Sequence, residues 1–217
     1  MYPHKTQLCL HLLVAASIAM PLCAEEPPAE RRYNSGPLTV TDFQAEVPDP
    51  LPKLGRLKQY AYADTDIRFQ MSYRYRTKAE GVEATLTDVD IYAVFLSDSS
   101  WMAPRGESTL DHEQGHFDIT QMYALDALLQ IKGRLNDGKS LVGRGEDVKS
   151  AAADLNNKLR EVLKPLHDRV ASAHKEYDRD TRHGVAKAHQ AEYRKQQVAK
   201  LAELIAELNE SKPADTP

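Results

Sequence analysis

The sequence predicts an α+β fold, in which a small antiparallel sheet packs on one long helix and a helical C-terminal half follows. Residues 67–76 alternate strictly between apolar and polar side chains, the pattern of a strand with one buried face. A second apolar run follows a turn at residues 78–81, which indicates an antiparallel hairpin. From about residue 108 onward, the pattern of apolar side chains is helical almost to the C-terminus.

The composition is that of one folded domain and gives no sign of a nucleic-acid partner. The chain has 217 residues, of which 41% are hydrophobic and 28% are charged, enough for a core of ordinary size. Its formal net charge is -4, and both signs are interspersed along the chain. Because binding to nucleic acid needs a clustered basic surface, we expect no nucleic-acid partner.

Residues 1–24 are predicted to be a signal peptide. The apolar run at 8–20 is too short for a comfortable membrane span, and it ends in small residues before Glu-Glu-Pro-Pro. Cleavage after Ala24 would place the protein in the periplasm or outside the cell, with no stable membrane span; an uncleaved N-terminal anchor is the alternative. Both cysteines, Cys9 and Cys23, would leave with the peptide, so any metal site must use histidine and carboxylate ligands.

Loops and strands are expected between the signal peptide and the helices. Residues 25–37 are polar and rich in proline, which predicts a flexible lead-in, and residues 38–43 are expected to form a first short strand. Three prolines make 47–55 a loop. In the hairpin that follows, the alternation slips phase at Asp88, where we expect a bulge or a break.

The first helical segment carries the sequence DHEQGHFDI close to its start. Ser108 is expected to cap its N-terminus, with Asp111 three residues later completing the cap. Positions i and i+4 of a helix lie on one face, so His112 and His116 can hold one zinc ion, and Glu113 can reach a water bound to it as general base. A catalytic zinc site needs a third protein ligand, which this segment lacks. The alternative is a solvated helix face with two histidines.

The helical C-terminal half is expected to contain two further segments. The first is kinked or divided at Pro165 and stops at Gly184. The second, at about 185–210, has an apolar stripe typical of a packing or self-association face, formed by Val198, Leu201, Ile205 and Leu208.

The residue pattern leaves several candidates for the third ligand. His183 lies at a helix end beside a glycine, where the chain can approach a metal closely; without a metal it would complement the helix dipole. His167 and His174 share one helix face, so they are a possible pair. Carboxylates of the same region are further candidates: Glu176, Asp178 and Asp180. Trp101, the single tryptophan, either lines a substrate cleft or belongs to the core.

Two segments together resemble the bacterial family known as domain of unknown function 922, whose members are described as secreted zinc-dependent proteases. The segments are HEQGHFDI and YDRDTRHG, and the matching positions are His112, Glu113, Gly115, His116, Phe117, Asp118, Ile119, Tyr177, Asp178, Thr181, His183 and Gly184. The chain departs from the family at its opening, where Val40-Thr41 replaces Trp-Ser. The resemblance covers roughly residues 38–190.

The resemblance makes His183 the expected third zinc ligand beside the two histidines of the helix. It implies that Tyr177 donates a hydrogen bond to the oxyanion of a tetrahedral intermediate. It also implies that Asp178 holds a ligand histidine by its second ring nitrogen. We therefore expect a zincin-like, zinc-bearing domain over 38–190, followed by a C-terminal helix and polar tail over 191–217.

The predicted function is zinc-dependent hydrolysis of peptide bonds in a protein or peptide substrate, with Glu113 as the general base. One alternative is a non-catalytic envelope binding module, in which the zinc is structural and closed by a fourth ligand such as Asp178. An open position beside Glu113 would argue against that alternative. Another is an amidase that acts on cell-wall peptides, which only the shape of the cleft would separate from a protease.

Overall fold

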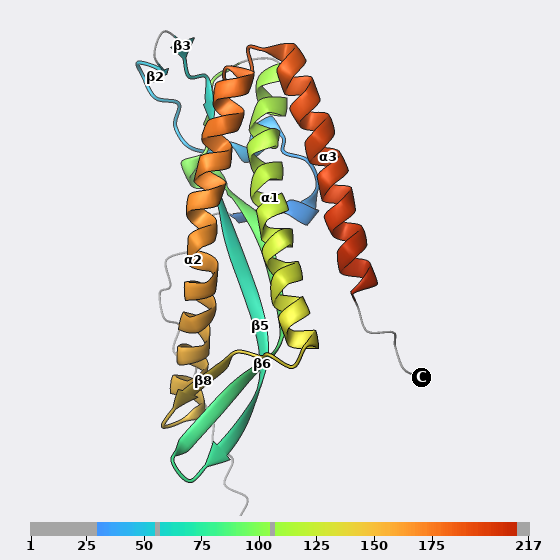
Figure 1. The fold of residues 1–217 in the computed structure, drawn as a ribbon. Helices are drawn as coiled ribbons and strands as arrows, with labels where there is room; N and C mark the ends of the chain where they lie inside the picture. The colour runs from blue at the N-terminus through green and yellow to red at the C-terminus, as the bar shows by residue number, and fades with distance from the viewer. Residues whose placement is uncertain (1–29, 55–56, 105–106, 212–217) are drawn as a thin grey trace, which may run out of the picture.

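The computed structural model describes residues 30–54, 57–104 and 107–211, and these form a mixed α+β fold (Figure 1). The predicted signal peptide and the residues of the polar tail after 211 lie outside the described residues. The expected fold class of an antiparallel sheet followed by helices is confirmed for the described part of the chain.

The main sheet is built on a long hairpin of β5 (Thr65–Lys78) and β6 (Gly81–Leu96). Two short strands pair with the other edge of β6: β1 (Glu30–Arg32) near its end and β8 (Val142–Gly145) near its start. The expected bulge is confirmed, because Asp88 pairs with Ser72 while Leu86 pairs with Tyr73. Thr87 therefore has no paired residue in the register with β5. The apolar side chains of β6 face inward both before and after Thr87.

Four two-residue strands form two small ladders outside the main sheet. β2 (Lys53–Leu54) pairs with β3 (Leu57–Lys58), and β4 (Ala61–Tyr62) pairs with β7 (Trp101–Met102). Three single 3-10 turns complete this part of the chain, at Tyr33–Ser35, Val40–Asp42 and Ser97–Ser99.

Two N-terminal predictions are corrected. The segment predicted as a flexible lead-in, 25–37, is structured from Glu30 onward, because β1 pairs with β6. The segment 38–43, predicted as a strand, instead contains a 3-10 turn. The backbone N–H and the hydroxyl group of Thr39 both donate to Oδ2 of Asp42, at 2.6 Å and 2.8 Å. This local capping competes with extended structure and closes the turn.

The helices are α1 (Glu107–Asn136), α2 (Val148–Thr181) and α3 (Lys187–Glu210). Because α1 begins before Ser108, this residue is not its N-cap, and Asp111 does not complete a cap. Asp111 instead accepts hydrogen bonds from two side chains of α3. Helix α2 continues through Pro165, which lies on its exposed side, where water can satisfy the carbonyl group that proline leaves unpaired.

The largest core cluster lies between the hairpin and the two helices α1 and α2. Helix α3 lies beside α1 (Figure 1), and Leu125 of α1 packs against Leu201 and Leu204 of α3. Only part of the apolar stripe predicted on α3 is therefore used for packing within the chain. Leu201 is buried, whereas Val198 and Ile205 are exposed. Within the described residues, no helix is both long and apolar enough to cross a membrane.

Candidate metal centre

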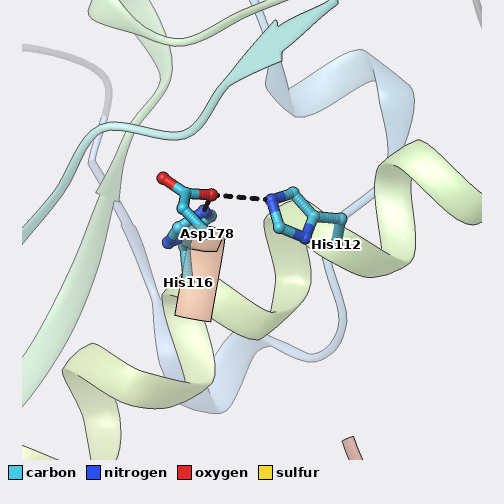
Figure 2. A group of neighbouring side chains, drawn as sticks. All are labelled: His112, His116 and Asp178. Atoms are coloured by element: carbon cyan, nitrogen blue, oxygen red, sulfur yellow. Dashed lines mark hydrogen bonds and ion pairs between the residues drawn. The ribbon is translucent and has the colours of Figure 1, made fainter. Parts of the chain in front are cut away.

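The two histidines of α1 meet a carboxylate from the last turn of α2 (Figure 2). The Nε2 atoms of His112 and His116 lie 3.0 Å and 3.1 Å from Oδ1 of Asp178. The potential ligand atoms of these three residues all lie within 4.8 Å of one another. Two imidazoles and a carboxylate that converge in this way could hold a metal ion.

Tyr177 packs against both histidine rings. Its ring stacks on that of His112, with centroids 4.8 Å apart and 14° between the planes, and meets the His116 ring edge-on at 5.1 Å. The Nδ1 atoms of both histidines are buried and have no hydrogen-bond partner within the described chain. Ligand histidines usually donate this second N–H to an oxygen acceptor. Here the two rings are oriented by their packing against Tyr177 and by the contacts of their Nε2 atoms with Asp178.

Gly115 makes room for Tyr177. A Cβ atom at Gly115 would lie 2.2 Å from the hydroxyl oxygen of Tyr177 and 2.6 Å from its Cζ. Tyr177 has no exposed surface, and its hydroxyl group donates to the carbonyl oxygen of His112 at 3.4 Å. A fully buried side chain does not reach a substrate, so the structure places Tyr177 away from the oxyanion position expected for it.

His183 lies in the turn that joins α2 to α3. Arg182, His183 and Gly184 have φ angles of 53°, 52° and 80°, so three consecutive residues are left-handed, which is uncommon outside glycine. A Cβ atom at Gly184 would lie 3.1 Å from that of His112, so glycine lets the turn approach α1 closely. The turn brings Nδ1 of His183 to 3.1 Å from Oδ1 of Asp178.

The sequence predicts His183 as the third ligand and Asp178 as a residue that holds a ligand histidine. The geometry favours the reverse, with Asp178 as the ligand and His183 beside it. The group of potential ligand atoms contains Asp178 with the two histidines of α1, and it does not contain His183. Burial opposes ionisation of Asp178. Hydrogen bonds from His112 and His116 outweigh it, and they hold the pKa of Asp178 well below its usual range. Asp178 is therefore an anion, as a carboxylate ligand must be.

Glu113 lies next to the histidine pair and is only 5% exposed. Its Oε2 accepts a hydrogen bond from the backbone N–H of Ala63 at 2.9 Å, just after β4. Burial raises the pKa of Glu113, and the opposing effects of His116, His112 and the Ala63 N–H cancel this only in part. A carboxyl group with a raised pKa is suited to accept a proton and return it.

A cleft of about 510 Å³ opens over these groups. One wall is the segment 58–63, which includes β4, and the other comes from α1, α2 and the turn after α2. The predicted site residues that line it are His112, Glu113, His116, Asp178 and His183. The cleft has the volume of a typical ligand site, and polar side chains line both of its walls, with Lys58 and Gln59 on the side of the segment 58–63.

His174 also lines the cleft, one helical turn before Asp178. Its Nε2 donates to the carbonyl oxygen of His116 at 3.2 Å, and its ring meets that of His116 edge-on at 4.9 Å. Burial, and then the charge of His116, lower the pKa of His174 to about 4. The sequence signal for this residue is its spacing of four from Asp178, which puts both on one face of α2.

A buried polar cluster joins α3 to another face of α1. Asp118 is 2% exposed and accepts hydrogen bonds from the hydroxyl group of Tyr33 at 2.8 Å and from Nε2 of Gln114 at 2.7 Å. Its second oxygen accepts from the guanidinium group of Arg194, which also donates to Asp111 at 3.0 Å. Asp118, which belongs to the HEQGHFDI segment, therefore supports the helix that carries the histidines.

The other sequence candidates for ligands lie away from this centre. The His167 side chain is 59% exposed and lies near Asp66. Glu176 and Asp180 are both paired with Arg179 on the surface of α2. None of these three candidates lines the cleft.

Two residues before α1 support the cleft wall. Trp101 is 8% exposed and lies in β7, which pairs with β4, so it belongs to the core behind the wall. Ala63 holds Glu113 through its backbone N–H. Sequence reasoning missed Ala63, because a backbone contact between segments so far apart leaves no side-chain signal.

Comparison with models of protein families, with curated proteins and with solved structures gives no match. The resemblance to domain of unknown function 922 therefore stays a prediction that rests on the two segments quoted above.

Proposed function

We propose that the protein is a zinc-dependent hydrolase that cleaves peptide bonds. The observation that carries this proposal is that the His112, His116 and Asp178 group lines the same cleft as the buried Glu113. We also propose that it acts outside the cytoplasm, because the sequence of residues 1–24 predicts export.

The donor set suits zinc. Catalytic zinc takes three protein ligands of the imidazole and carboxylate types and keeps one position open. The ring nitrogens lie 3.0 Å and 3.1 Å from the Asp178 oxygen. Neighbouring ligand atoms of a tetrahedral site with bonds of about 2.0–2.1 Å are about 3.3 Å apart. When bound, zinc polarises a carbonyl oxygen and acidifies a water molecule.

Glu113 would move the proton. The Ala63 N–H holds Oε2 of Glu113, which leaves Oε1 to accept a proton from the attacking water. The same carboxyl group would then give this proton to the leaving amine nitrogen. The raised pKa of Glu113 favours the first of these steps, because a less basic carboxylate would accept the proton less readily.

We assign Asp178 as the third ligand and His183 as the residue that positions it. Nδ1 of His183 lies 3.1 Å from Oδ1 of Asp178, where it can orient the carboxylate as the partners of ligand carboxylates commonly do. A helix that bears two ligands and a base, beside a strand that borders the cleft, is also the general plan of zincins. We propose the zincin likeness on this arrangement, and it is an analogy of architecture.

One observation favours a non-catalytic alternative. Because His183 already contacts Asp178, its ring could supply a fourth ligand and close the site, as in structural zinc centres. The open cleft beside Glu113 favours the catalytic assignment over this alternative. Hydrolysis of cell-wall peptides by an amidase would use the same residues, so the choice of substrate separates it from a protease.

The test replaces Glu113 by glutamine and measures zinc content and hydrolysis. A library of fluorogenic peptides and a preparation of cell-wall peptides serve as substrates. We expect Glu113→Gln to keep about one zinc per chain and to lose about 100-fold or more in kcat. The control is Glu176→Gln, because Glu176 is an exposed glutamate outside the cleft, and it should keep full activity. Equal hydrolysis by Glu113→Gln and the parent would refute the general-base assignment.

A further inference from the structure

Two large apolar side chains of α3 lie exposed on one side of the helix. Val198 and Ile205 are 60% and 48% exposed, although both belong to a helix that is otherwise packed on α1. Ala191 and Ala202 lie on the same side, because they are spaced seven and four residues from Val198, and the exposed Lys195 lies between them. Together these residues form a narrow stripe in which Lys195 is the charged member, and its alanines allow a second helix to approach closely.

The charges of α3 are divided between its two halves. The first half, 187–200, carries four basic residues and one acidic residue: Lys187, Glu192, Arg194, Lys195 and Lys200. The second half, 201–210, carries only acidic charges: Glu203, Glu207 and Glu210. Arg194 is held by Asp118 and Asp111 of α1, so it does not face a second copy. Two copies of the helix still attract when antiparallel, because the other basic residues of the first half then meet the acidic second half of the partner. In a parallel pair, like charges would meet.

We propose that two copies of this chain associate through α3, with the two helices antiparallel. A two-fold axis near Ala202 places Val198 of one copy opposite Ile205 of the other. It also places Lys195 beside the acidic last turn of the partner helix. The alanines of the stripe let the two backbones approach closely.

Among the residues that the structure describes, this association uses a face that does not pack on α1. Leu201 and Leu204 are buried, and they pack on the opposite side against α1, together with the Arg194 contact to Asp118. The stripe does not include residues that line the cleft. The inference is therefore independent of the metal and of the proposed hydrolysis.

Sedimentation velocity of residues 25–217, the predicted mature protein, tests the association in the presence of a chelator and of zinc. We expect a concentration-dependent dimer in both conditions. The double variant Val198→Asp/Ile205→Asp should raise the dissociation constant by about 100-fold or more, because it buries carboxylates in the seam. The control Val40→Asp changes a valine that is 57% exposed on another surface, and it should leave the dimer intact. Circular dichroism confirms that each variant is folded.

The orientation is tested by cysteine cross-linking, since residues 25–217 contain no cysteine. Ala202→Cys should form a disulfide-linked dimer on oxidation, because the two sulfur atoms meet near the axis. Lys195→Cys should not, because antiparallel helices separate these positions by about 20 Å. A monomer at all concentrations, a dimer that survives the Val198→Asp/Ile205→Asp change, or equal cross-linking at both positions would overturn the proposal.

Discussion

Replacing Gly115 by alanine is expected to destabilise the protein, although alanine is the better helix former. In an unobstructed helix interior, this change stabilises by about 1 kcal/mol. At Gly115 the new Cβ atom would lie 2.2 Å from the hydroxyl oxygen of Tyr177. Tyr177 is fully buried between the histidine rings and the ring of Tyr193, so it cannot swing away without disturbing them.

The size of the effect follows from a matched variant in the same helix. A Cβ atom at Gly133 meets nothing within 4 Å, so Gly133→Ala should gain about 1 kcal/mol. Overpacking of a filled core costs about 1–3 kcal/mol. Gly115→Ala should therefore be less stable than Gly133→Ala by at least that amount. Because Tyr177 also packs against both histidine rings of the proposed metal site, Gly115→Ala should in addition weaken metal binding.

The assay is urea denaturation of the metal-free protein, followed by competition titration with a zinc indicator. The expected result is a lower free energy of unfolding and a weaker zinc affinity for Gly115→Ala, with neither change in Gly133→Ala. If both alanine variants were stabilised equally and bound zinc as the parent does, the contact between Gly115 and Tyr177 would not have the role assigned to it.

Two further predictions concern stability. Arg194→Met should cost about 3 kcal/mol in urea denaturation, because it leaves the charge of Asp118 buried without its cation. Lys200→Met removes an exposed pair and should leave the free energy of unfolding nearly unchanged. Equal losses would contradict this. For His174, burial lowers the folded pKa to about 4, so the unfolded chain binds the proton more tightly. Stability of the metal-free protein should therefore fall as pH drops from about 6.5 to 4, and His174→Gln should remove about 3 kcal/mol of that fall. If the free energy of unfolding of His174→Gln fell with pH as much as that of the parent, the lowered pKa of His174 would not be the cause.

The parts of the fold that depend on local patterns could be predicted from the sequence. The alternation over 67–76 defines β5, and the slip at Asp88 corresponds to the bulge. Strand β8 could not be predicted, because Val142–Gly145 has two glycines and is extended only by pairing with β6. The turn at Val40–Asp42 was missed, because capping by Asp42 outweighs the strand preference of its neighbours.

The candidate site also has a part that local sequence patterns predict and a part that depends on how the helices pack. The spacing of His112 and His116 is a property of one helix, so the sequence alone predicts that they share a face. The choice between Asp178 and His183 depends on the left-handed turn after α2, which no spacing rule gives. The packing role of Tyr177 was also beyond sequence reasoning, because it follows from the fit of α2 against α1.

The most direct test of the account is the metal content of three proteins, measured by plasma mass spectrometry after purification with zinc. They are the parent from residue 25, Asp178→Ala and His183→Ala. The account predicts about one zinc per chain in the parent and in His183→Ala, and much less in Asp178→Ala. Zinc retained in Asp178→Ala but lost from His183→Ala would show that His183 is the third ligand. A parent without metal would contradict the metal centre itself.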